Sequence, residues 1–190
     1  MPQQRLGVFL LCLLLSGCAC LNKPDEIEPP IAMPIAPPTG PGRRVVQQIS
    51  AHWPGNRQES LLCVLELDKQ QIAIAGLTND GLDLFNVTYD GKSLKLDKSP
   101  LLPDSVAPEL MLADMQLVYW PLELLQKTVR APWRLDVGQR YRRLFYNNQQ
   151  VIDVNYLAPD PVWPRSVELI NYRYNYRLLI KTVSYEALPE

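Results

Sequence analysis

The chain has 190 residues, of which 47% are hydrophobic and 21% charged, and its formal net charge is −1 at pH 7. This length suits one domain with a sizeable core, and the balanced charge gives no reason to expect binding to nucleic acid or to an anionic lipid surface. With one histidine, no GxSxG and no glycine-rich phosphate loop, the sequence lacks the common catalytic signatures, so we expect no enzyme and no metal site.

The first 17 residues have the layout of a secretory signal. Arg5 precedes an apolar run over residues 6–15, and the small residues Ser16 and Gly17 follow it. That run is too short to cross a bilayer, which takes about 20 residues. The motif "LSGC" resembles the bacterial lipobox, in which the cysteine is lipidated and the chain is cut before it. The resemblance implies a lipoprotein signal peptide over 1–17 and a covalent lipid on Cys18, with no other cofactor.

The residues around Cys18 suggest a location. Lipoprotein sorting reads the residue after the lipidated cysteine, and Ala19 at that position implies the outer membrane, on its periplasmic face. The alternative is an ordinary cleaved signal with a stray cysteine. Cys20 could form a disulfide with Cys63 in the oxidising periplasm, or Cys63 could be a small buried hydrophobe within "LLCVLEL".

A proline-rich segment separates the anchor from the rest of the chain. Seven prolines lie between Pro24 and Pro41. Proline has no N–H and a fixed φ, so such a segment forms neither helix nor sheet and stays extended. We therefore expect a tether over residues 18–43 and a single domain over residues 44–190.

The first half of that domain has the pattern of an antiparallel meander. "VVQQISAHW", "ESLLCVLELD", "QQIAIAGLT", "LDLFNVTY" and "KSLKLD" follow one another, and Asn/Asp–Gly pairs at 80–81 and 90–91 mark tight hairpins. Ile72 and Ile74 share one face of their strand, as do Phe85 and Val87. "LLCVLEL" is apolar at successive positions, which predicts a strand covered on both faces.

The middle of the domain has helical spacing. "DSVAPELMLADMQLVYWPLELLQKTV" predicts a helix with Pro108 in its first turn, capped by Asp104 or Ser105, and a second short helix beginning at Pro121. Asp114 falls within the apolar stripe, where a carboxylate needs a partner. We expect bonds to backbone groups or to one of three arginines, 140, 142 or 143; a contact with a ligand head group is the alternative.

Strands resume from "WRLDV" to "YRLLIKTVSY", which gives about ten strands with one helical insert. A sheet of that size must curl. The predicted fold class is therefore mainly β with a helical insert, a curled antiparallel sheet whose concave face the helices cover, enclosing either an apolar cavity or a filled core. The predicted cavity residues are Ile72, Ile74, Phe85, Val87, Leu110, Met111, Leu117, Leu122 and Leu125.

Three motifs carry a more specific resemblance: "YDGK", "SPLLP" and "LADMQLVYWP". They are similar to those of a family of bacterial lipoproteins encoded with aryl polyene and related fatty-acid-like biosynthesis genes, which in turn resembles the outer-membrane receptor family LolB. The resemblance implies an incomplete, LolA/LolB-like half-barrel over an acyl-chain cavity. It also implies a membrane-contact loop at "AGLTNDGL", with Leu77 as its apolar tip, although Leu77 could equally end the core of its strand.

These features together predict a function. The lead hypothesis is a monomeric, noncatalytic outer-membrane lipoprotein that binds an acyl moiety or a lipidated or polyene client and aids its transfer to the outer membrane. The expected partners are outer-membrane lipids and a LolA-like periplasmic carrier, with no nucleic acid. The alternative is a structural or assembly lipoprotein that acts through protein–protein contacts and has a filled interior.

Overall fold

The computed structural model describes residues 33–189. The predicted signal peptide over 1–17, the lipidation of Cys18 and most of the predicted tether lie outside the described residues and stay predictions.

Ten antiparallel strands form one sheet, in the order β5-β4-β3-β2-β1-β10-β9-β8-β7-β6. The strands of the first half are β1 (Arg43–Trp53), β2 (Arg57–Leu67), β3 (Ile72–Leu77), β4 (Asp83–Tyr89) and β5 (Leu94–Lys98). The strands of the second half are β6 (Trp133–Val137), β7 (Tyr141–Tyr146), β8 (Gln149–Ala158), β9 (Ser166–Asn171) and β10 (Tyr176–Ala187). Two helices, α1 (Pro108–Tyr119) and α2 (Leu122–Thr128), lie between the halves in sequence.

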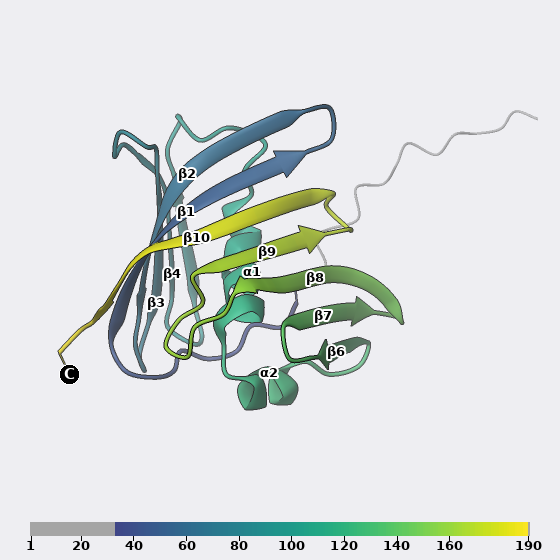
Figure 1. Ribbon diagram of the computed structural model, residues 1–190. Coiled ribbons are helices and arrows are strands. Elements are labelled where there is room, and N and C mark those ends of the chain that lie inside the picture. The colour runs from purple at the N-terminus through teal and green to yellow at the C-terminus, as the bar shows by residue number, and fades with distance from the viewer. Residues whose placement is uncertain (1–32, 190) are drawn as a thin grey trace, which may run out of the picture. The chain divides into compact units, whose positions relative to one another are not determined.

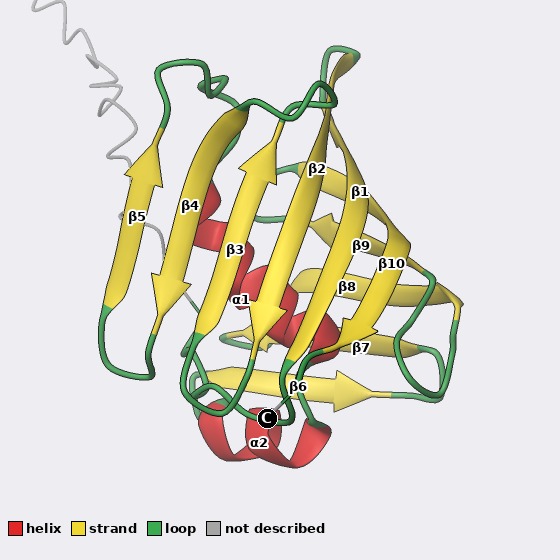
Figure 2. Cartoon of the chain, turned by 90° about the vertical axis from the view of Figure 1, so that its left-hand side faces the viewer, coloured by secondary structure: helices red, strands yellow, loops and turns green. Residues whose placement is uncertain are grey.

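Each half is a simple meander, and the two halves join where the first strand pairs with the last, from Arg43 opposite Ala187 to His52 opposite Arg177. The sheet does not close, because its edges are β5 and β6, and the helical insert connects these two edges. Figure 1 shows α1 inside the curve of the sheet, and Figure 2 shows it crossing behind β1–β4. The predicted fold class, mainly β with a curled, unclosed antiparallel sheet and a helical insert, is confirmed.

The concave face of the sheet carries the core. In β2 the buried side chains alternate, with Cys63 and Leu65 at or below 1% exposure, while Leu62 and Val64 are half-buried on the convex face. The expectation that this strand is covered on both faces is therefore wrong. The helical layer covers only the concave side, and the aliphatic side chains of β2 on the convex face stay half-buried.

One close approach fixes the packing between β3 and β4. Gly76 lies opposite Phe85, and a Cβ placed on Gly76 would come within 2.1 Å of the Phe85 ring. Phe85 is completely buried. The ring therefore occupies the space that any larger residue at 76 would need.

Helix α1 is buried on nearly all sides, since the sheet curves around it. Its N-cap is Ala107, which makes no side-chain cap, so the predicted capping by Asp104 or Ser105 is wrong, whereas Pro108 does lie in the first turn. The second helix begins immediately after Pro121, as predicted. Neither helix in residues 33–189 has the length and hydropathy needed to cross a membrane.

Side chains of the second meander donate hydrogen bonds to the C-terminal carbonyls of α1. Arg142 Nη1 donates to the carbonyls of Leu117 and Trp120, both at 2.9 Å, and the Tyr156 hydroxyl donates to the carbonyl of Val118 at 2.6 Å. A cation at this end also complements the helix dipole. These bonds fix α1 against β7 and β8.

The last part of the predicted tether packs as part of the domain. Met33 and Ala36 are 3% and 0% exposed. The buried side chain of Gln116 on α1 accepts a hydrogen bond from the Ala36 N–H and donates one to the Ala36 carbonyl, both at 2.7 Å. Trp120 Nε1 donates to the Pro37 carbonyl at 3.1 Å. The packed domain thus starts before residue 44, because one glutamine amide supplies the backbone partners that a proline-rich segment cannot find in a sheet.

An apolar cavity as the candidate functional site

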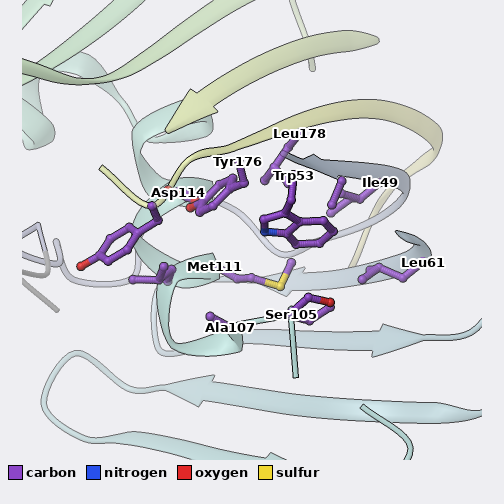
Figure 3. Close-up of a pocket in the computed structure, with 13 residues that line it drawn as sticks. Ile49, Trp53, Leu61, Ser105, Ala107, Met111, Asp114, Tyr176 and Leu178 are labelled. Carbon is purple, nitrogen blue, oxygen red and sulfur yellow. The ribbon is translucent and has the colours of Figure 1, made fainter. Parts of the chain in front are cut away.

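A cavity of about 160 Å³ lies between α1 and the sheet, beside the seam between the two meanders. Figure 3 shows its lining. The apolar wall comes from β1, β2, β10 and α1 and consists of Ile49, Ala51, Trp53, Leu61, Leu110, Met111 and Leu178. The remaining lining residues are Ser105, Val106 and Ala107 from the loop before α1, with Asp114, Tyr174 and Tyr176.

The cavity has an open side and a buried side. Ala107 is exposed and Trp53 and Ser105 are half-buried, whereas Asp114 is only 5% exposed. An apolar cavity of about 150 Å³ in another protein is large enough to hold benzene. The resting cavity therefore accommodates a short apolar group, and a longer chain must either extend through the open side or widen the space under α1.

The buried side of the cavity carries a polar network. The Tyr176 hydroxyl donates to Asp114 Oδ2 at 2.5 Å, and Asn171 Nδ2 donates to the Tyr176 hydroxyl at 3.0 Å. Asn171 Oδ1 accepts the backbone N–H groups of Arg173 and Tyr174, at 3.1 and 3.0 Å. Since backbone N–H groups can only donate, they fix the orientation of the Asn171 amide, and this in turn directs the Tyr176 proton toward Asp114.

Burial dominates the electrostatics of this network. It raises the pKa of Asp114 to about 7, against the lowering effect of the Tyr176 hydrogen bond. The pKa of Tyr176 lies well above its ordinary value, because burial and the neighbouring Asp114 charge both disfavour the phenolate. Asp114 therefore gains its proton near neutral pH, while Tyr176 remains a donor.

Tyr174 supplies a polar atom with unused hydrogen-bonding capacity. Its hydroxyl oxygen is buried and has no hydrogen-bond partner among the described residues, and the residue lines the cavity. An unpaired buried hydroxyl costs about 1–3 kcal/mol. Because that oxygen has almost no accessible surface, other atoms of Tyr174 line the cavity and the hydroxyl stays unpaired.

Only some of the predicted cavity residues line the cavity of the structure. Leu110 and Met111 line the cavity, but the other seven do not. Of those seven, Leu122 is half-buried and the rest are packed in the core at 1% exposure or less: Ile72, Ile74, Phe85, Val87, Leu117 and Leu125. The apolar faces of β3 and β4 were identifiable from their alternation, but the position of the empty space depends on the β1–β10 seam.

The predicted membrane-contact residue lies on the convex face. Leu77 is the last residue of β3, is half-buried and pairs with Leu62. The turn that follows is short, with Thr78 and Leu82 bonded backbone to backbone at 2.9 Å. Leu82 is 56% exposed, so it is the exposed leucine of the segment "AGLTNDGL".

The partner of Asp114 differs from the one expected. Arg142 bonds to the carbonyls of α1, and Arg143 pairs with Asp153 at 3.4 Å, whereas Asp114 bonds to Tyr176. The tyrosines of "NYRYNYRLL" alternate in sequence and would share one face of an unbroken strand. A turn at 172–175 interrupts the strand instead, and Tyr174 and Tyr176 both line the cavity.

Other chemistry-bearing residues are structural. Cys63 is a free, completely buried thiol, and burial raises its pKa to about 12. Among residues 33–189, no group of three or more His, Cys, Asp or Glu is placed to hold a metal ion.

Residues 44–184 match the family described as "Protein of unknown function (DUF3261)". The chain belongs to the DUF3261 family. No curated protein matches it in sequence.

Solved structures similar to this DUF3261 chain are distant. A LolA superfamily protein from Nitrosomonas europaea has 7% identity and a TM-score of 0.48, covering 79% of this chain and 87% of its own. An outer membrane lipoprotein-sorting protein domain from Vibrio parahaemolyticus has 8% identity and a TM-score of 0.43, covering 79% and 88%. A DUF1329 family protein from Desulfovibrio piger has 6% identity and a TM-score of 0.41, covering 78% and 86%. Similarities at this level carry no argument about function.

Proposed function

We propose that this chain is a noncatalytic envelope lipoprotein that binds an acyl chain, or a client that carries one, under α1. The observation that supports this most directly is the apolar cavity of about 160 Å³, which is open on one side and lined mainly by aliphatic and aromatic side chains. Burial of an acyl chain there would be driven by about 25 cal/mol per Å² of apolar surface. Release to another apolar environment needs no chemical step.

The proposed location is the periplasmic face of the outer membrane, with a lipid on Cys18 as the anchor. This rests on the lipobox-like "LSGC" and on Ala19. A LolA-like periplasmic carrier would deliver the acylated or polyene client, and outer-membrane lipids would receive it. We further propose that the segment of Leu77 contacts the membrane, and that Leu82 is its apolar tip because it is the more exposed of the two.

Binding of an apolar probe tests this function. The full chain with Cys18→Ser, which cannot be lipidated, should bind a hydrocarbon such as dodecane. Ala51 lines the cavity and is 5% exposed, so Ala51→Leu should fill the space and weaken binding about tenfold or more. Ala73→Leu adds the same atoms on the convex face and should leave binding unchanged. Equal binding by both variants would contradict the proposal.

The alternative function, a structural or assembly lipoprotein, predicts a different result. Its interior would stay closed to ligands, so neither dodecane nor co-purifying lipid should be found with the chain. Mass spectrometry of the full chain with Cys18→Ser, purified from native cells without detergent, distinguishes the two functions.

A further inference from the structure

A second hollow, of about 430 Å³, lies at the other end of α1 from the apolar cavity. Its lining comes from the C-terminal end of α1, the start of β1, the strands β7, β8 and β10, and the loop between β8 and β9. Unlike the apolar cavity, it has two cationic side chains in its lining, Arg43 and Arg142. We call it the arginine cleft. The binding of an acyl chain under α1 does not account for it.

The two arginines use their guanidinium groups in the same way. Arg43 Nη1 donates to the carbonyls of Pro41 and Thr39, at 2.8 and 3.2 Å. Arg142 Nη1 donates to two carbonyls at the end of α1. Within residues 33–189, Nε and Nη2 of both side chains have no hydrogen-bond partner. These two nitrogens share one edge of a guanidinium and form the fork that binds two oxygens of an oxyanion, so each arginine keeps one unused fork.

The unused forks are not sealed inside the protein. The unpaired side-chain atoms that are completely buried in the described part of the chain are Gln47 Oε1, Trp163 Nε1 and the Tyr174 hydroxyl, and no arginine nitrogen is among them. Arg43 is 8% exposed and Arg142 is half-buried, so their forks keep some solvent-accessible surface. Because both residues line the arginine cleft, a small anion in the cleft has access to them.

Neither guanidinium has a carboxylate partner among residues 33–189, although other arginines of the sheet do, such as Arg143 with Asp153. Burial lowers the pKa of both cleft arginines, because neighbouring tyrosines, together with Asp68 in the case of Arg43, offset only part of the cost of desolvation. The carbonyls at the end of α1 stabilise Arg142 but carry no formal charge. Since buried charges in proteins are usually paired, this pair of guanidiniums favours the binding of an anion.

The one carboxylate among the described lining residues, Asp160, is already bonded. Its Oδ1 accepts hydrogen bonds from the backbone N–H groups of Val162 and Trp163, at 2.9 and 3.4 Å. Its Oδ2 accepts one from Arg165 Nε at 3.3 Å. Three donors therefore offset the Asp160 charge, and positive charge predominates in the cleft.

Aromatic rings form the wall of the cleft beside Arg43. The ring centroids of Trp163 and Tyr119 are 4.3 Å apart and stacked, and those of Trp163 and Tyr185 are 5.9 Å apart. The guanidinium carbon of Arg43 is 5.8 Å from the centroid of the Trp163 ring. These rings keep water from one side of the guanidinium, and a hydrogen bond to a charged group is stronger where water is excluded.

We propose that the arginine cleft binds a phosphate monoester, whose oxygens accept hydrogen bonds from the Nε–Nη2 forks of Arg43 and Arg142. A phosphate monoester has three terminal oxygens and can accept from two forks at once, whereas one fork occupies both oxygens of a carboxylate. The head group of a phosphatidic acid and a small soluble phosphate ester share this chemistry. The proposal does not depend on acyl binding, because the cleft and the apolar cavity have no lining residue in common.

Matched anions test the proposal. The full chain with Cys18→Ser is titrated by calorimetry with glycerol 3-phosphate and with glycerate, at about pH 7.5, where the phosphate carries close to two charges. Chloride keeps the ionic strength constant. We expect glycerol 3-phosphate to bind about tenfold or more tightly than glycerate.

Conservative variants assign the binding to the forks. Arg43→Lys and Arg142→Lys keep the charge and a donor for the carbonyls but lose the fork, so each should weaken glycerol 3-phosphate about tenfold. Arg57→Lys makes the same change at an exposed arginine at the other end of β1 and β2, and should leave binding unchanged. If one cleft variant does not fold, as circular dichroism would show, the other decides.

A further titration identifies the source of the phosphate. Dihexanoyl phosphatidic acid is compared with glycerol 3-phosphate in Ala51→Leu, where the apolar cavity is filled and cannot contribute. Binding of the lipid about tenfold or more tightly than glycerol 3-phosphate supports a lipid head group, and equal binding supports a soluble phosphate ester.

Three results would overturn the phosphate site: no binding of glycerol 3-phosphate, binding no tighter than that of glycerate, or binding that neither cleft variant weakens. Titration of the same variants with dodecane reports on the apolar cavity. Failure of the phosphate site is therefore distinguishable from failure of the proposed function.

Discussion

Asp114 shows how one polar residue can shape an otherwise apolar interior. A buried carboxylate is costly unless hydrogen bonds stabilise it, and here a single hydroxyl bond from Tyr176 offsets only part of the cost, so the pKa of Asp114 rises to about 7. The hairpin turn fixes the Asn171 side-chain amide, and this amide orients the Tyr176 hydroxyl, which donates its hydrogen bond to Asp114. The carboxyl position is thus determined by a backbone turn in another part of the chain.

Asp114 should make the stability of the fold depend on pH. Its ordinary pKa of 3.8 applies to the unfolded chain and about 7 to the folded one, so the folded state binds the proton more tightly. The stabilisation that protonated Asp114 gives to the folded state is therefore fully present below about pH 4, and it is lost as pH rises through about 7. Between about pH 5 and pH 8, wild type should lose about 3 kcal/mol more of its unfolding free energy than Asp114→Asn.

Urea unfolding of both proteins at the two pH values measures this difference. Asp153→Asn is a matched control, because Asp153 is partly exposed and paired with Arg143. Parallel pH profiles for wild type and Asp114→Asn would show that the carboxyl is not buried as described.

Gly76 should be intolerant of any side chain. Gly76→Ala places a methyl group against the Phe85 ring, which is itself completely buried, so we expect a loss of about 1–3 kcal/mol in unfolding free energy. The loss of unfolding free energy caused by Gly76→Ala should be smaller in a Phe85→Leu background, where the ring is absent. A double-mutant cycle in urea measures the coupling, and additive effects would mean that the ring does not set the requirement for glycine.

At the level of elements, the structure depends on contacts that helix and strand patterns do not encode. Segment 33–39 contacts α1 through the Gln116 side chain rather than through a sheet ladder. The C-terminal end of α1 is satisfied by Arg142 and Tyr156 from β7 and β8. In both cases long polar side chains replace regular backbone pairing.

Gln116 should therefore be more important than its place in a helix suggests. Gln116→Leu keeps a similar size but leaves the buried N–H and carbonyl of Ala36 unpaired, which we expect to cost about 2–4 kcal/mol. Hydrogen exchange over 33–39 should accelerate in the variant. Gln126→Leu, on the exposed side of α2, is the control. Unchanged exchange in Gln116→Leu would show that the segment is held by other contacts.

At the level of the whole molecule, the sequence predicts local structure better than it predicts the position of the site. Alternation and Asn/Asp–Gly turns predict both meanders, and Pro121 predicts the break between the helices. The pairing of β1 with β10 joins segments more than 120 residues apart, and no local pattern specifies it. The cavity lies at that seam, which is why Leu110 and Met111 line it while Ile72 and Phe85 fill the core.

The open sheet should allow the cavity to widen for long ligands. The resting volume of about 160 Å³ suits a group of about six carbons, while each further buried CH₂ would add about 0.8 kcal/mol. Because the edges β5 and β6 are not bonded to each other and the loop 99–107 on the open side carries no helix or strand, we expect this loop and the first turn of α1 to move away from the sheet, while bonds from β7 and β8 hold the other end of α1. We therefore expect the affinity for linear alkanes to keep rising beyond six carbons, with faster hydrogen exchange over 99–107 in the long-chain complexes. An affinity that stops rising at about six carbons, with no change in exchange, would mean that the domain is rigid and that its ligand is a small one.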